Sequence, residues 1–342
     1  MTGKKTDKKE RDTIMKKYLI QGNSTGMHQY RADLHHHTVK SDGRLTPEQT
    51  KELYMQRGYA IVAFTDHADY FVHNDLTDDH FLALNGVELD VEPDPEPHWK
   101  ANHICWVALT PDIREDTIWN LFPNIDPSKA PAGYGNSPRP FTAENVNRLI
   151  RLGQDSGFFV TYNHPTWSRE TADDYLRYEG MNAMEVVNGE PDQYDEENGA
   201  AYDDLLRAGK RLYAVAADDS HGGCVDPAKF GGNVMIFAPE LKYTVITDAL
   251  VKGHFYAPHD WNAPLIDEMI WEDGKIMLKT GPAKEVAWFT DKETGLLTAD
   301  EGKLKTEWTL EIPEGLYFRL EIKAENGSRT YTNAYFTDEL YL

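Results

Sequence analysis

Cysteine is scarce in this sequence. Among its 342 residues only Cys105 and Cys224 occur, and they lie far apart in the chain. Two thiols are too few for a disulfide scaffold or for a cysteine zinc site. Any bound metal ion must therefore be held by histidine, aspartate or glutamate.

Long apolar runs are also missing. No stretch approaches the ~18 to 20 apolar residues that a membrane span needs, so we expect no membrane partner. Residues 1–29 begin with the lysine-rich MTGKKTDKKERDTIMKKYLI, which lacks the apolar core of a signal peptide and predicts a polar leader. A cytoplasmic location follows as the default expectation.

Basic residues are outnumbered: 35 lysines and arginines stand against 57 aspartates and glutamates, which gives a formal charge of -22. Such a charge repels duplex nucleic acid and anionic bilayers at long range, so neither is an expected partner, and a nuclease acting on long duplexes is disfavoured. Apolar residues make up 40% of the chain, which is enough for a substantial core and argues against disorder.

Residues 30–264 alternate short apolar runs with helix-like segments, which is typical of parallel β/α units. The expected strands lie in YRADLHH, AIVAFTDH, FLALNGVEL, HICWVALT, FFVTYNHP, AMEVVNG and LYAVAADDSH. One expected helix lies in TPEQTKELYMQRG, with Thr46 as N-cap, Pro47 in the first turn and Gly58 as the stop. TAENVNRLIRLGQDSG and YDEENGAAYDDLLRAG predict two more helices. This alternation predicts an α/β domain.

Two other regions differ from this pattern. Residues 121–140 are rich in proline and glycine and predict a long loop, which is either a lid or a plain connection. Residues 265–342 consist of strand-like pieces separated by turn signals such as EDGK and ENGS, which predict a small antiparallel β-sandwich. We expect its Trp288, Trp308 and Tyr317 to fill the sandwich core rather than line a ligand face.

Asp33 to Gly43 reads DLHHHTVKSDG, with three consecutive histidines followed by Asp42. If the histidines end a strand, His35 and His37 point to one face and His36 to the other. Two imidazoles on one face can share a metal ion. Taken alone, this stretch fits a metal site and an ordinary surface cluster equally well.

Possible metal ligands also end most of the other apolar runs. These residues are Asp66, His67, Glu88, His164, Asp219 and His221, whereas His103 opens the run HICWVAL. Only 13 of the 342 residues are histidines, so their repeated placement at strand ends is improbable by chance. The carboxyl ends of the strands of a parallel β/α barrel converge on one mouth. The pattern therefore predicts a metal site.

Six motifs in this order resemble the PHP (polymerase and histidinol phosphatase) superfamily of metal-dependent phosphoesterases: DLHHHT..SDG, FTDHAD, GVEL, HICWVAL, YNHP and DDSHGG. The resemblance covers about Tyr30 to Pro258. It implies a distorted (β/α)7 barrel with three divalent metal ions at its mouth, here followed by the C-terminal sandwich. KGHFYAPHDWNAPLID, at the passage into the β module, resembles the CehA-like subgroup less specifically.

Carried over by motif, the resemblance implies three sets of ligands. The first ion would be held by His35, His37, Glu88 and Asp219. The second would be held by Asp42, His67 and His221. The third would be held by Glu88, His103 and His164, with Glu88 bridging two ions and with His98 as the alternative to His103. Nitrogen and oxygen ligands without thiolate suit Mn, Fe or Zn better than Mg or Ca.

Other residues near the motifs have two open interpretations each. Asp33 and Asp66 either accept the second N–H of a ligating imidazole or only cap turns. Lys40, Arg44, Trp167 and Arg169 are weak candidates for substrate contacts, because each is more often a plain surface residue. Trp99 and Tyr134 are weaker candidates still.

The resemblance implies a phosphoesterase in which a metal-bridging hydroxide attacks the phosphate ester of a small metabolite, nucleotide or short oligonucleotide. A carbamate, ester or amide hydrolase on the same ions is the nearest alternative, because the same nucleophile can add to a carbonyl carbon. A ligand-binding protein with a structural metal site is the alternative from another class. The sequence predicts no particular oligomeric state.

Overall fold

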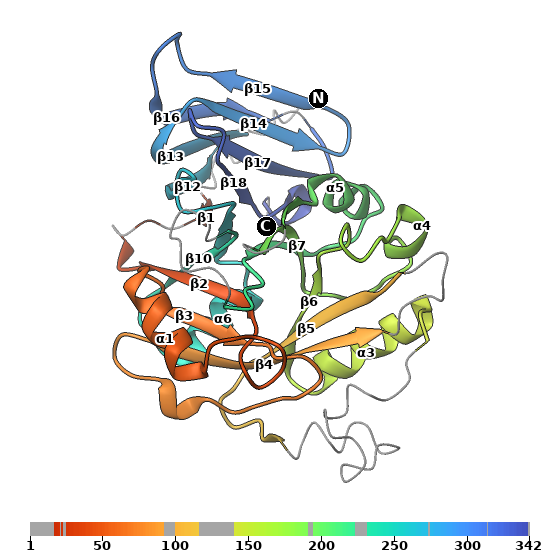
Figure 1. The fold of residues 1–342 in the computed structure, drawn as a ribbon. Coiled ribbons are helices and arrows are strands. Elements are labelled where there is room, and N and C mark those ends of the chain that lie inside the picture. Colours follow the sequence, from red (N-terminus) through yellow and green to blue (C-terminus); the bar gives the residue numbers. More distant parts are fainter. Residues whose placement is uncertain are drawn as a thin grey trace, which may run out of the picture.

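The computed structural model describes residues 17–20, 22, 25–91, 100–115, 140–190, 194–222, 231–272, 274–312 and 314–340. The expected loop at 121–140, apart from its last residue, lies outside the described residues. So do His98, Trp99, Tyr134 and Cys224. The described chain is rich in strands, and a few helices cover its largest sheet (Figure 1).

All seven apolar runs expected to be strands form strands. They are β2 (His28–His36), β3 (Ile61–Phe64), β4 (Leu82–Val91), β5 (Asn102–Ala108), β6 (Phe158–Asn163), β7 (Ala183–Glu190) and β9 (Tyr213–Ala217). Three further strands are β8 (Tyr194–Glu197), β10 (Val234–Ala238) and β11 (Phe255–Pro258). The expectation of a helix beginning at YDEE was wrong, because these residues pair with β7 as β8.

The large sheet is mixed rather than wholly parallel. Strands β2, β3 and β4 run parallel, as do β6, β7 and β9, but β5 is antiparallel to both β4 and β6. The expected (β/α)7 barrel is therefore confirmed only as an α/β fold with a large sheet. One isolated parallel bridge joins His36 to Ser220, and it brings the carboxyl ends of β2 and β9 together.

The helices are short. They are α1 (Pro47–Gln56), α3 (Ala143–Asp155), α4 (Ala172–Tyr175), α5 (Gly199–Arg207) and α6 (Tyr243–Val251), with 3-10 turns η2 (Asn74–Leu76) and η5 (Thr337–Glu339). Helix α1 begins as expected: the Thr46 hydroxyl accepts from Gln49 N–H at 3.3 Å, and Gln49 Oε1 accepts from Thr46 N–H at 2.9 Å. No helix in the described ranges is both long and apolar enough to cross a bilayer.

The C-terminal strands form two antiparallel layers. They are β12 (Ile266–Glu272), β13 (Lys275–Ala283), β14 (Glu285–Thr290), β15 (Thr294–Thr298), β16 (Lys305–Glu311), β17 (Tyr317–Lys323), β18 (Arg329–Thr332) and β19 (Tyr335–Phe336). One layer has the strand order β1-β12-β13-β16, where β1 is Lys17–Ile20, and the other contains β15-β14-β17-β18. Trp308 is buried in the sandwich core as expected, with Trp288 partly buried against it. Tyr317 is also buried, but in the core cluster that includes Tyr202 of α5 rather than in the sandwich core.

Two pairings tie this sandwich to the rest of the chain. Strand β1 comes from the expected polar leader yet pairs with β12, because its apolar Leu19 and Ile20 are buried in the sandwich core. Strand β11 pairs with β18, so the large sheet continues into the second layer across the expected boundary at residue 265. The division into domains stays a prediction.

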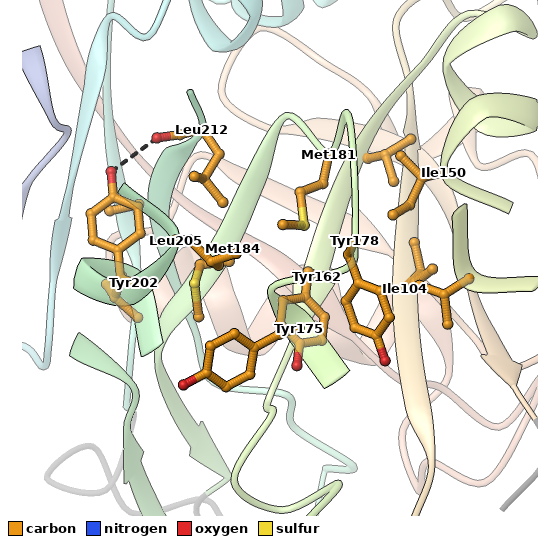
Figure 2. Close-up of a cluster of buried hydrophobic side chains, with 14 of the residues drawn as sticks. Ile104, Ile150, Tyr162, Tyr175, Tyr178, Met181, Met184, Tyr202, Leu205 and Leu212 are labelled. Atoms are coloured by element: carbon orange, nitrogen blue, oxygen red, sulfur yellow. Dashed lines mark hydrogen bonds between the residues drawn. The ribbon is translucent and has the colours of Figure 1, made fainter. Parts of the chain in front are cut away.

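A buried apolar cluster supports β6 and β7 (Figure 2). Tyr162 of β6 and Met184 of β7 lie in it with side chains from α3 and α5. Tyr202 of α5 also donates its hydroxyl hydrogen to the Leu212 carbonyl at 3.0 Å. Each fully buried large apolar side chain contributes roughly 1.5 to 3 kcal/mol. This packing fixes the two strands whose polar residues reach the site described next.

Candidate metal centre

The nine predicted ligands converge in space although they are spread over nearly two hundred positions of the chain. Together with Asp90 they form four overlapping groups of histidine and carboxylate atoms that could hold metal ions. The ligands come from the carboxyl ends of β2 and β6, from β4 and β5, and from the segments after β2, β3 and β9. The isolated bridge between His36 and Ser220 places the ligands at the end of β2 beside those that follow β9.

The predicted first set is the most deeply buried. His35 Nε2 and His37 Nε2 lie 3.1 Å apart, and each lies 3.2 Å from Glu88 Oε2 and 3.1 Å from Asp219 Oδ1. Ligand atoms about 2.0 to 2.2 Å from one ion are roughly 3 to 3.5 Å from one another. The four atoms therefore have the spacing of ligands around one ion.

The predicted second set lies closer to solvent. His221 Nε2 is 3.4 Å and His67 Nε2 is 3.8 Å from Asp42 Oδ2, and the Asp42 side chain is 55% exposed. His37 joins this group through its other ring nitrogen, since Nδ1 lies 3.7 Å from Asp42 Oδ1. His37 thus faces two sets.

The predicted third set shares Glu88 with the first. Glu88 Oε1 lies 3.0 Å from His103 Nδ1 and 3.2 Å from His164 Nε2, whereas Oε2 faces His35 and His37. The two oxygens of one carboxylate therefore face two groups of imidazoles. This is the geometry of the expected bridging ligand.

Buried atoms without hydrogen-bond partners support a cation at this place. Among the described residues, Glu88 Oε2, Asp219 Oδ1 and His67 Nδ1 are buried and make no hydrogen bond. An unsatisfied buried polar atom is costly, and an unsatisfied charged one more so. Since these atoms converge at ligand spacing and carry nitrogen and oxygen donors, the residues fit divalent ions.

The histidines and carboxylates of this centre shift one another's pKa values. Burial lowers the pKa of His35, but Asp219, Cys105 and Glu88 around it raise that pKa well above its ordinary value overall. Burial raises the pKa of Glu88, but His35 and His103 hold it well below its usual range. Divalent ions would take the place of these imidazole protons, so metal uptake would release protons.

His36 points away from the centre, as the strand alternation predicts. Its Nδ1 lies 3.1 Å from the Tyr54 hydroxyl and its Nε2 lies 3.0 Å from Thr50 Oγ1, both on α1. Burial and the neighbouring His37 lower the pKa of His36 well below its ordinary value, which keeps it neutral. It ties α1 to the sheet.

Asp33 and Asp66 both bind backbone. Asp33 Oδ1 accepts from His35 N–H at 3.3 Å, and Asp33 Oδ2 lies 3.7 Å from Nδ1 of His36, which is not a predicted ligand. Asp66 Oδ1 accepts from Thr38 N–H at 2.8 Å and from Ser41 N–H at 3.1 Å. Asp66 therefore caps the turn that contains Asp42. This agrees with the interpretation that Asp66 caps a turn rather than accepting an imidazole N–H.

Two carboxylates that the motifs do not include also reach the ligands. Glu185 Oε1 lies 2.7 Å from His35 Nδ1, and Asp90 Oδ1 lies 3.3 Å from His67 Nδ1. Both carry a signal in the sequence. Glu185 is a lone acid in the apolar run AMEVVNG, and Asp90 follows Glu88 by two positions on the same strand face.

Of the weak substrate candidates, Trp167 lies against the centre. Its ring centroid is 5.2 Å from those of His103 and His164. The Lys40 ammonium lies 5.2 Å from the centre of the Phe71 ring, and Arg44 donates its backbone N–H to the His221 carbonyl at 2.8 Å. Arg169 has a positive φ of 58° in the turn after Trp167. Substrate contacts by these residues stay predictions.

Comparison with known proteins gives limited overlap. No protein-family model matches the chain. A DNA polymerase/3'-5' exonuclease PolX of Bacillus subtilis (strain 168) is 33% identical over 84 residues, which cover 19% of this chain and only 15% of that protein. A two-domain protein of Bacteroides vulgatus ATCC 8482, containing a predicted PHP-like metal-dependent phosphoesterase, matches 93% of this chain and 98% of its own, with 15% identity and a TM-score of 0.47.

The chain resembles PHP-like metal-dependent phosphoesterases. The sequence motifs predict the same resemblance. An amidohydrolase of Chromobacterium violaceum is a further structural match, with 17% identity, a TM-score of 0.37 and coverage of 66% of this chain and 96% of that one. The PHP-like ligand sets, the number of ions and the choice among Mn, Fe and Zn stay predictions.

Proposed function

We propose that this protein is a metal-dependent hydrolase that cleaves the phosphate ester of a small metabolite, nucleotide or short oligonucleotide. The observation that carries the proposal is the Glu88 carboxylate, whose two oxygens face two different groups of imidazoles at 3.0 to 3.2 Å. A carboxylate placed in this way holds neighbouring divalent ions close enough to act on one substrate.

The candidate ligands differ in how deeply they are buried. His35, His37, Glu88 and Asp219 form a floor from which water is largely excluded, since their side chains are at most 13% exposed. Asp42, His67 and His221 form the open side, where a substrate can enter. Ions bound between the two would activate a water and offset the negative charge of the phosphoryl oxygens.

The charge of the centre favours an anionic substrate. Glu88, Asp219, Asp42 and Asp90 supply four carboxylates, and nearby histidines hold the pKa of each below its usual range although burial acts against this. Three divalent ions would more than balance these charges and leave the pocket positive at contact range. The overall charge of -22 would keep long polyanions away. A small phosphorylated substrate fits both conditions.

The test joins metal analysis to a panel of nucleotides, sugar phosphates, a nitrophenyl phosphate and a nitrophenyl ester. We expect bound divalent metal and turnover of phosphates. His37→Ala should lower kcat/KM at least 100-fold, because His37 faces the first and second sets with different ring nitrogens. His80→Ala, which removes an exposed histidine, is the matched control.

Three results would contradict the proposal in different ways. Turnover of the ester but not of phosphates would favour the carbonyl hydrolase. Absence of all hydrolysis in a fully metallated sample, together with specific ligand retention, would favour a binding protein. Wild-type activity in His37→Ala would remove the metal centre from the mechanism.

A further inference from the structure

Glu185 is a buried carboxylate that contacts several of the predicted ligands. It lies on β7 with 1% exposure, and its Oε1 is 2.7 Å from His35 Nδ1. Its other oxygen, Oε2, accepts from the His164 backbone N–H at 2.9 Å and from Asn188 Nδ2 at 3.0 Å. Asn188 Nδ2 in turn lies 3.0 Å from Asp219 Oδ2. One buried carboxylate is therefore connected to three predicted ligands.

The contact to His35 decides which ring nitrogen is free. A carboxylate only accepts, so Nδ1 of His35 must carry the hydrogen that points at Glu185. Nε2 is then left with its lone pair, and Nε2 is the atom that faces His37, Glu88 and Asp219. The Asn163 amide also lies 3.0 Å from His35 Nδ1, but an amide can turn its oxygen toward that hydrogen whereas the carboxylate cannot donate.

Glu185 and Asn188 also contact two residues, His164 and Asp219, whose backbone has a positive φ. His164 has φ of +25° and Asp219 has φ of +47°, which non-glycine residues seldom adopt. Such conformations are strained and persist where the surroundings hold them. Glu185 binds the backbone N–H of the first, and Asn188 binds the side chain of the second.

An irregularity of β7 makes this arrangement possible. In a regular strand, residues three positions apart point to opposite faces. The register between β7 and β9 shifts between Glu185 and Val187, as at a β-bulge, and this shift lets Glu185 and Asn188 bond to each other on one face. The bulge therefore places both side chains on the face of β7 that contacts the predicted metal ligands.

We propose that Glu185, with Asn188, is the positioning residue of the metal centre: it fixes the His35 tautomer that presents Nε2 and holds His164 and Asp219 in their strained backbone conformations. This rests on the proposed function, because it assigns Glu185 a role toward the ions of that site. Carboxylate partners of ligating histidines commonly change metal affinity by roughly 10- to 100-fold when they are lost.

The test uses Co²⁺ on the metal-free full chain, with absorption spectra, affinity from chelator competition, and the melting temperature of the metal-free protein. Glu185→Gln keeps the size but cannot accept at both side-chain atoms. We expect a roughly 10- to 100-fold loss of affinity for the tightest ion and an altered cobalt spectrum. Asn188→Ala should show a smaller loss, and it serves if Glu185→Gln does not fold.

Glu170→Gln is the matched control. Glu170 is a partly buried acid near β6, but it binds Tyr162, Tyr178 and Asn102 and none of the predicted ligands. Its variant should keep the wild-type cobalt spectrum and affinity. Equal losses in Glu170→Gln and Glu185→Gln would show a general structural effect and overturn the positioning role.

The remaining outcomes separate this proposal from the proposed function. Wild-type affinity and spectrum in both Glu185→Gln and Asn188→Ala would overturn the role of Glu185 while leaving the metal-dependent hydrolase intact. A wild-type protein that binds no Co²⁺ and turns over no phosphate would overturn the proposed function, and the positioning role would fall with it.

Discussion

Glu170 shows how one partly buried side chain makes stability depend on pH. Burial raises its pKa to about 7, although hydrogen bonds from Tyr178, Tyr162 and Asn102 act in the opposite direction. The folded protein therefore holds a proton at Glu170 that the unfolded chain, with a pKa near 4.5, has already released. Stability is lost as pH rises from about 4.5 to about 7, by about 3 kcal/mol in order of magnitude.

Glu170→Gln should remove this dependence, because the amide resembles the protonated acid and does not titrate. We expect the difference in unfolding free energy between pH 5 and pH 8 to shrink by about 2 to 3 kcal/mol relative to wild type. Urea unfolding at the two pH values measures it. Glu179→Gln, at a 67% exposed side chain, is the control and should change nothing. An unchanged difference in Glu170→Gln would contradict the raised pKa.

At the scale of elements, the sequence predicted strands better than their directions. The hydrophobicity of seven apolar runs in residues 30–264 is enough to predict the strands β2 to β7 and β9. The antiparallel course of β5 has no such local signal, because it depends on how β4 and β6 pair with it. The segment YDEE has one apolar residue, Tyr194, followed by three acids, so its strand β8 has no hydrophobic signal and depends on pairing with the end of β7.

The same limit applies to the site. His35, His37 and Glu88 stand out by residue type, whereas Glu185 matters through a bulge in β7 that no local pattern of AMEVVNG reveals. The alternation of side chains along β2 correctly separated His36 from its neighbours. Candidate ligands can thus be read from the sequence, whereas the side chains that support them depend on tertiary pairing.

Helix α1 offers an element-scale prediction. Thr46 caps its N-terminus, and the helix carries Tyr54, whose hydroxyl donates to Asp218 Oδ2 at 2.5 Å. Thr46→Ala should lower the free energy of unfolding by about 1 kcal/mol, because one backbone N–H loses its acceptor. Thr46→Ser keeps the hydroxyl and should stay within about 0.5 kcal/mol of wild type. Equal stabilities of the two variants in urea unfolding would show that the cap contributes nothing.

At the scale of the whole molecule, a continuous sheet and the buried Arg319 both link residues 265–342 to the preceding α/β part. The sheet passes from β10 through β11 into β18 and β17, so the α/β part and the C-terminal sandwich share backbone hydrogen bonds. Arg319 of β17 is 1% exposed and donates to Asp203 of α5 in two hydrogen bonds of 2.6 and 2.8 Å. Its third contact is Glu321 at 2.7 Å.

Arg319→Ala should therefore destabilise the whole chain. It removes the cation that binds Asp203 and leaves Glu321 with Arg329 at 3.9 Å. The loss of one partner of a buried ion pair costs about 3 to 5 kcal/mol. Arg319→Lys keeps the charge but cannot bind Asp203 with two nitrogens, so it should fall between Arg319→Ala and wild type. Lys303→Ala, which removes a 71% exposed partner of Asp300, is the control and should change stability by less than about 1 kcal/mol.

Calorimetry of these variants also tests the continuity of the sheet. Because backbone pairing crosses residue 265, we expect wild type to unfold in one cooperative transition and Arg319→Ala to lower that single transition. Two resolved transitions in wild type, with only the second sensitive to Arg319, would instead show that residues 265–342 unfold as a separate unit. A loss below about 1 kcal/mol in Arg319→Ala would mean that the ion pairs at this junction do not hold the two halves together.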